Sequence, residues 1–180
     1  MKEYLKHAIE FLNAHTDELD MLWPVNSWSM YRSFCRRNGL IFNCGATRFV
    51  ICGKDFVIKI DNRHRMRRYS KFGGCYTEYK NWQMVQDDGM GYLFAAVNRI
   101  KVGHHFYYVM PVIKSIEDEC SDLWDTDLVT AEESEYLMDN FCDLHCGNYG
   151  VDDEGNIKIF DYSLTCEYYA RYHRMVITTR

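Results

Sequence analysis

The chain has little proline and no long apolar stretch. Only 2 of its 180 residues are proline and 47% are hydrophobic, so we expect an ordered chain with a substantial core in one compact unit. No apolar run reaches the length of a membrane-spanning helix, and residues 1–4 do not open a signal peptide. The sequence therefore predicts a cytoplasmic protein without a membrane partner.

An excess of positive charge is also missing. The formal net charge is −5 at pH 7, which disfavours general nucleic-acid binding. The 8 cysteines come without an export signal, so we expect free thiols rather than disulfides. Cys142, His145 and Cys146 lie close together, but no second pair stands at zinc-finger spacing. We interpret these cysteines as small packing residues, with a zinc site as the alternative.

Apolar periodicity predicts helices in the first part of the chain and short strands from residue 40 on. Apolar residues recur at i, i+3, i+4 and i+7 from Leu5 to Leu12, and a second helix is expected over residues 27–37. A third is expected over 75–85. Strands are predicted at 40–44, 48–52, 55–60, 92–101 and 104–112. The arginine-rich segment Arg63–Lys71 is interpreted as a solvated linker, with a grip on an acidic or phosphorylated partner as the alternative.

After residue 112 the pattern is again helical. Residues 130–133 read Thr-Ala-Glu-Glu, a capping box in which the Thr hydroxyl and the last Glu satisfy each other's free N–H groups. The acidic stretch 117–135 is expected to be a solvated helical face. Two small strands are predicted at 149–151 and 157–160.

Three polar residues near the end of the chain have the spacing of a phosphoryl-transfer site. Asn148 follows Asp143 by five residues (148 − 143), and Asp161 follows Asn148 by thirteen (161 − 148). A carboxylate can accept or orient a hydroxyl proton, and Asn and Asp oxygens are hard ligands suited to Mg²⁺. The alternative is an ordinary loop Asp and Asn, with Asp161 at the end of a strand.

A lysine and a glutamate upstream complete the set. Lys59 lies in the predicted strand sequence Val-Ile-Lys-Ile, and Glu78 follows it by nineteen residues (78 − 59) on a predicted helix. Buried apolar neighbours would hold the lysine stem, and the carboxylate would pair with the ammonium and aim it. Taken singly, each would more often be an exposed surface residue.

The order Lys59, Glu78, Asp143, Asn148, Asp161 resembles that of protein kinases. The resemblance implies that Asp143 is the catalytic base, that Lys59 contacts the ATP phosphates and pairs with Glu78, and that Asn148 and Asp161 bind Mg²⁺. The catalytic loop and small size are similar to the serine/threonine kinases of T7-type bacteriophages, which act in host takeover. The Asp-Leu-His opening also resembles small-molecule phosphotransferases of the aminoglycoside kinase type.

The kinase pattern is incomplete at the nucleotide loop and at the end of the chain. Residues 43–50 keep one of three glycines, Gly45, with Arg48 at the place of the third. Tyr162 and Ser163 replace Phe-Gly after the metal-binding Asp, and only nineteen residues follow Asp161 (180 − 161), without Ala-Pro-Glu. The predicted nucleotide-binding residues are Gly45, Arg48, Lys59, Met110 and Val112.

The resemblance implies an α+β, protein-kinase-like fold. It would comprise an N-terminal helical segment (1–39), a lobe with a small antiparallel sheet and one helix (40–112), and a reduced helical lobe (113–180). The implied function is Mg²⁺- and ATP-dependent phosphorylation of a Ser/Thr or Tyr hydroxyl on a host protein, in the host cytoplasm. One alternative is a kinase-like binding protein that inhibits or recruits a host factor. The other is a small-molecule phosphotransferase, with 117–135 as its acceptor pocket.

Overall fold

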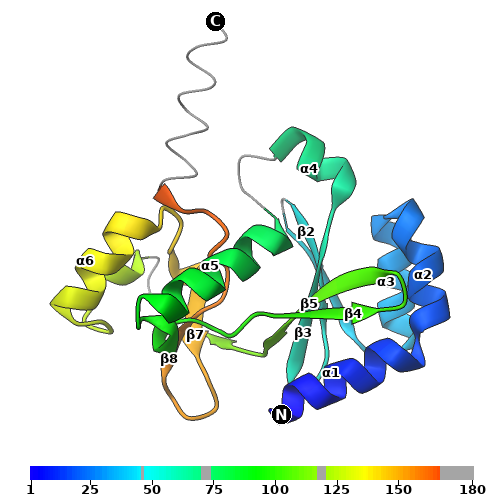
Figure 1. Cartoon of the computed structure of the whole chain (residues 1–180), viewed down its shortest axis with the longest axis horizontal. Coiled ribbons are helices and arrows are strands. Elements are labelled where there is room, and N and C mark those ends of the chain that lie inside the picture. The colour runs from blue at the N-terminus through cyan, green and yellow to red at the C-terminus, as the bar shows by residue number, and fades with distance from the viewer. Residues whose placement is uncertain (46, 70–73, 117–120, 167–180) are drawn as a thin grey trace, which may run out of the picture.

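The computed structural model describes residues 1–45, 47–69, 74–116 and 121–166 (Figure 1). In this part of the chain, helices surround two small antiparallel sheets. The predicted α+β class with a small antiparallel sheet is therefore confirmed. None of the described helices is long and apolar enough to cross a membrane.

The larger sheet has five strands in the order β1-β2-β3-β5-β4. Its strands are β1 (Ile41–Cys44), β2 (Arg48–Cys52), β3 (Phe56–Asp61), β4 (Asn98–Val102) and β5 (His105–Pro111). Each is antiparallel to its neighbours. All five were predicted, but β4 is shorter than expected because residues 91–93 form a 3₁₀ turn, η2 (Gly91–Leu93).

Strand alternation divides the β3 side chains between two environments. Successive side chains of a strand point to opposite faces of the sheet. Phe56, Ile58 and Ile60 belong to one apolar core. Val57 packs against a second core, and Lys59 lines a cavity on that side.

Three N-terminal helices cover the first face of the sheet (Figure 1). They are α1 (Glu3–Ala14), α2 (Thr16–Val25) and α3 (Trp28–Arg37). Their buried residues, among them Leu12, Leu22 and Phe34, form one core with β2, β3 and β5. The segments 1–39 and 40–112 thus share a core. The helix α2 was not predicted; it buries only Leu19 and Leu22, too few apolar positions for a clear period.

The basic segment after β3 is a helix, α4 (Arg63–Tyr69), and the predicted linker is wrong. Two asparagines fix its start. The Arg63 backbone N–H donates to Asn26 Oδ1 at 2.8 Å, and that of Arg65 donates to Asn62 Oδ1 at 3.2 Å. Side-chain oxygens that accept from the first free N–H groups favour a helix start.

The helix α5 (Cys75–Asp87) packs against the second face of the sheet (Figure 1), as predicted. Its first N–H, from Cys75, donates to the side chain of Asp61 at 2.8 Å. A Cβ at Gly74 would lie 2.7 Å from that same carboxylate oxygen, so a larger residue here would have to displace the Asp61 carboxylate. The contact ties the end of β3 to the start of α5, one turn before Glu78.

The rest of the described chain forms a smaller unit beside α5, on the side away from the three N-terminal helices (Figure 1). It contains β6 (Lys114–Ser115), η3 (Leu123–Asp125), α6 (Ala131–Asn140), η4 (Cys146–Asn148), β7 (Tyr149–Val151) and β8 (Ile157–Ile159). The capping box is confirmed, since Thr130 N donates to Glu133 Oε2 at 2.6 Å and Glu133 N to Thr130 Oγ1 at 3.3 Å. Helix directly after Pro111 is wrong, because β6 pairs with β7 there. Residues 117–120 lie outside the described part.

Candidate functional site

The predicted pairing of Lys59 and Glu78 is present. The Lys59 Nζ lies 2.8 Å from Glu78 Oε1 and 3.0 Å from Oε2. It also donates to the carbonyl oxygen of Phe160 at 2.6 Å. An ammonium has three N–H donors, so each donor has an acceptor. Both side chains are buried, which makes this a desolvated pair rather than a surface salt bridge.

Arg48 joins this pair, a role that the sequence analysis missed. Its Nη1 donates to Glu78 Oε2 at 2.9 Å. Its Nη2 donates to Asp161 Oδ1 and to Ser163 Oγ at 3.2 Å. The structure thus directs the guanidinium to two carboxylates, where we had expected it at the nucleotide phosphates.

Strand alternation could have revealed the position of Arg48. Its neighbours Phe49 and Ile51 are apolar and face the first core. Arg48 and Val50 must then share the other face, and Val50 pairs with Lys59 across the β2–β3 ladder. Diagonal neighbours on one face lie within reach of long side chains. This pattern therefore predicts that the side chains of Arg48 and Lys59 lie close together on this face.

The Glu78 carboxylate is fully buried, and both of its oxygens accept hydrogen bonds. Its side chain is 0% exposed, and it accepts from Arg48, from Lys59 and from the backbone N–H of Tyr162 at 3.3 Å. With its lone pairs occupied in this way, Glu78 positions Lys59 and Arg48. It does not face the cavity where a substrate would bind.

Asp161 stands at the boundary between this buried network and the cavity. Its side chain is 38% exposed and lines the cavity. Desolvation favours its neutral form, but the Arg48 guanidinium and the Lys59 ammonium outweigh this effect and hold the pKa of Asp161 below its ordinary value. Asp161 is therefore ionised at neutral pH.

The position of Asp161 is fixed by the buried residue that follows it, Tyr162. The Tyr162 ring is buried, and its hydroxyl donates to the Ala95 carbonyl at 2.6 Å. The Asn81 amide donates to the Tyr162 carbonyl at 2.7 Å. The Tyr-Ser that replaces Phe-Gly is thus part of the core, and it fixes the direction in which Asp161 points.

Asp143 and Asn148 are held together in one loop. The Asn148 side-chain amide donates to the Asp143 carbonyl at 2.7 Å, which leaves its oxygen as the ligand-capable atom. The Gly147 N–H donates to His145 Nδ1 at 3.0 Å, and His145 Nε2 lies 3.6 Å from Asp143 Oδ1. His145 therefore helps to shape the loop.

The Asp143 carboxyl is half-exposed, with 49% of its side chain accessible. Partial desolvation raises its pKa above the ordinary value, and Asp161 and Asp122 add to this, while His145 and Arg48 oppose it. A carboxylate with a raised pKa is a better proton acceptor near neutral pH. The two aspartates are therefore shifted in opposite directions.

A cavity of about 500 Å³ opens beside this network. It contains Gly45, Lys59, Met110, Val112 and Asp161 of the predicted residues, and its volume suits a ligand the size of a nucleotide. Val50, Val57 and Met110 supply apolar wall. The cavity is not lined by Arg48, Asp143 or Asn148. It therefore contains the predicted nucleotide-binding residues except Arg48, but not the predicted catalytic base.

The surroundings of Val112 and Gly45 limit how these two predicted residues could contact a nucleotide. The Val112 backbone N–H already donates to the Asp55 carbonyl at 3.1 Å, so Val112 would contact a base through its side chain or carbonyl. A Cβ at Gly45 would meet nothing closer than the Arg48 carbonyl at 4.0 Å. The protein's own packing therefore does not require glycine at this position.

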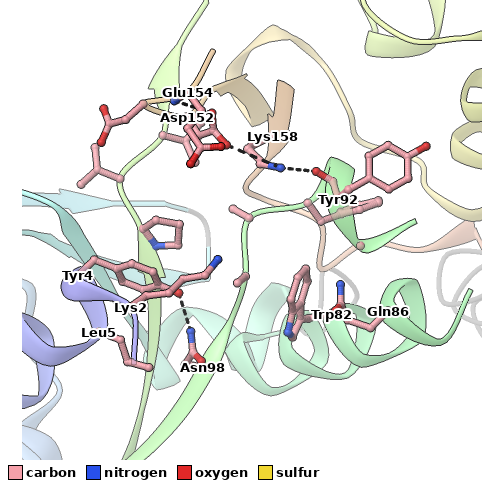
Figure 2. A pocket seen from close by; sticks show the side chains of 18 residues that line it. Lys2, Tyr4, Leu5, Trp82, Gln86, Tyr92, Asn98, Asp152, Glu154 and Lys158 are labelled. Atoms are coloured by element: carbon pink, nitrogen blue, oxygen red, sulfur yellow. Dashed lines mark hydrogen bonds and ion pairs between the residues drawn. The ribbon is translucent and has the colours of Figure 1, made fainter. Parts of the chain in front are cut away.

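A larger cavity of about 680 Å³ lies elsewhere. Figure 2 shows it between the start of α1, with Tyr4, the α5 residue Trp82, and the β7–β8 hairpin, with Asp152 in the turn and Lys158 in β8. Of the predicted site residues it contains only Val112. The larger cavity is lined by charged residues of its own but by neither Lys59 nor Asp161, so we assign the candidate site to the smaller cavity.

Metal binding would rest on few protein atoms. Among the described residues, no group of three or more His, Cys, Asp or Glu side chains could hold a metal ion. This leaves the zinc alternative without support in that part of the chain, where the Sγ atoms of Cys142 and Cys166 lie 2.7 Å apart. Mg²⁺ commonly binds one or two protein oxygens together with substrate phosphates, and the expected role of Asp161 and Asn148 as such ligands stays a prediction.

Comparisons with family models, curated proteins and solved structures gave no match for this chain.

Proposed function

We propose that the chain is a minimal, protein-kinase-like phosphotransferase that moves the γ-phosphoryl group of ATP to a hydroxyl of a protein. The observation that carries the proposal is the buried Lys59–Glu78 pair beside a cavity that Asp161 also lines. Phosphoryl transfer depends mainly on positioning and charge stabilisation, and this network supplies both. The resemblance to phage kinases supports a host protein in the host cytoplasm as the target.

The binding step follows from the contacts of Lys59. Two of its donors are held by Glu78, and the third goes to the Phe160 carbonyl. A phosphate oxygen in the cavity would replace that neutral carbonyl as acceptor, and a charge-assisted bond is stronger. Glu78 would keep the ammonium in place during this exchange.

The transfer step would use Asp143. Its carboxylate accepts the proton of the acceptor hydroxyl while the hydroxyl oxygen forms a bond to the γ-phosphorus. The bond from that phosphorus to the β,γ-bridging oxygen breaks, and ADP leaves with its electron pair. Asn148 and Asp161 would hold Mg²⁺, which neutralises charge on the phosphates when bound. The half-exposed position of Asp143 leaves room for an acceptor from outside.

Labelled phosphate transfer tests the proposal directly. Purified protein with γ-labelled ATP, Mg²⁺ and host lysate should label a protein band. Lys59→Met and Asp143→Asn should abolish the label, while Lys101→Met, at an exposed lysine of β4, should leave it unchanged. Label that persists in folded Lys59→Met protein would refute the proposal.

A contact-based function is the second candidate, favoured by the Arg48–Asp161 ion pair. A cation already at the metal-binding carboxylate is compatible with a protein that binds a host factor without turnover. In that case Lys59→Met protein should keep its full effect in cells, because Lys59 is buried and contributes little to an outer surface. For a small-molecule phosphotransferase, the described part of 117–135 lines neither cavity.

A further inference from the structure

The charges around Asp161 balance without a metal ion. Glu78 and Asp161 are carboxylates, and Lys59 and Arg48 are cations in contact with them. With Lys59 alone, the group would carry one excess negative charge beside the cavity. That excess would repel nucleotide phosphates, and a bound divalent cation would ordinarily remove the repulsion.

Arg48 is built into this position. Only 9% of its side chain is exposed, and its guanidinium donates to Glu78, Asp161 and Ser163. A guanidinium is charged at any physiological pH, and its planar fork suits two carboxylates at once. Removing either carboxylate would leave a buried cation poorly compensated, so the arrangement resists rearrangement when a ligand binds.

We propose that Arg48 is a resident counter-cation for Asp161, so that the site binds ATP with little gain from Mg²⁺. The proposal rests on the proposed function, because it requires a nucleotide in the cavity. Arg48 does not line that cavity and acts through Asp161, which makes it a positioning residue. Mg²⁺ would then be needed for transfer but contribute little to binding.

The test compares ATP dissociation constants, measured by calorimetry, in excess Mg²⁺ and in EDTA. For the unaltered protein the two constants should differ by less than about threefold. Arg48→Met should weaken binding in EDTA and raise the ratio to about tenfold or more. Arg48→Lys keeps a cation and should restore a low ratio. Arg32→Met, at an exposed arginine of α3, should behave like the unaltered protein.

Each outcome has one meaning. A ratio of about tenfold or more in the unaltered protein would overturn the proposal, and so would a low ratio in folded Arg48→Met protein. If Arg48→Met does not fold, Asp161→Asn decides, since removal of the carboxylate that Arg48 neutralises should leave binding in EDTA intact. A marked loss there would contradict the proposal. Absence of ATP binding under both conditions would instead refute the proposed function.

Discussion

The two halves of the candidate site differ in how firmly they are held. On the sheet side, Glu78 is fully buried, and two cations and a backbone N–H donate to it. On the loop side, 49% of the Asp143 side chain is exposed, and His145 Nε2 lies 3.6 Å from its carboxylate. Under the proposed function, groups that bind a nucleotide gain from being fixed in advance, whereas a proton acceptor must remain open to an incoming protein.

The largest effect on stability is expected when Glu78 is removed from the buried, sheet-side half of the candidate site. Glu78→Gln keeps the side-chain shape but leaves Lys59 and Arg48 without a shared carboxylate. Loss of one partner from a buried ion pair costs about 3–5 kcal/mol. Denaturant unfolding should show this loss, whereas Glu132→Gln, at an exposed position of α6, should change stability by less than about 0.5 kcal/mol. Equal stabilities would mean that the network does not hold the fold together.

The second prediction concerns the exposed half. Asp143→Asn should reduce phosphoryl transfer by roughly 100- to 10,000-fold, the usual range for loss of a positioned base. Its melting temperature and ATP affinity should stay unchanged, because Asp143 does not line the cavity. Asp139→Asn, at an exposed position of α6, is the matched control. A variant that lost ATP affinity and transfer to the same degree would assign Asp143 to nucleotide binding.

The pH dependence of stability should separate the two aspartates. The pKa of Asp161 is lowered in the fold, so its ionised form adds stability that is present above the ordinary carboxyl pKa and lost as pH falls through the lowered value. Asp161→Asn should therefore cost roughly 1 kcal/mol at pH 7, and the difference from the unaltered protein should shrink in acid.

Asp143 should show the opposite sign. Its pKa is raised, so ionisation disfavours the folded state as pH rises through the ordinary carboxyl pKa and then through the raised one. Asp143→Asn should be as stable as the unaltered protein at pH 7, or slightly more so. Unfolding curves of both variants between pH 3 and 7 test the pair. If the stability difference from the unaltered protein changed with pH in the same way for both variants, the environments assigned to Asp161 and Asp143 would be wrong.

The smallest effect is expected at the rim of the cavity. Gly45→Ala introduces a Cβ that meets only the Arg48 carbonyl at 4.0 Å, so the melting temperature should not change. If phosphates approach the backbone here, ATP affinity should fall by about threefold, somewhat under 1 kcal/mol. Unchanged affinity would place the phosphates away from this loop.

Local sequence patterns were sufficient for most strands and for α5. The strands β2 and β3 are short runs of mostly apolar, β-branched or aromatic residues, and turn residues separate them, so local sequence limits the choices. The helices α2 and α4 lack such a pattern. The helix α2 buries only Leu19 and Leu22. The start of α4 depends on Asn26, which accepts a hydrogen bond from the Arg63 backbone N–H across 37 residues of chain, and such a contact leaves no local pattern.

For the site, the sequence by itself determined which residues belong together, and the tertiary structure decided what they touch. The grouping of Lys59, Glu78 and Asp161 followed from the resemblance of their order in the chain to that of protein kinases. Whether Arg48 would face phosphates or carboxylates was not readable. Its partners Glu78 and Asp161 lie 30 and 113 residues away, and only closure of the fold brings those charges within hydrogen-bonding distance.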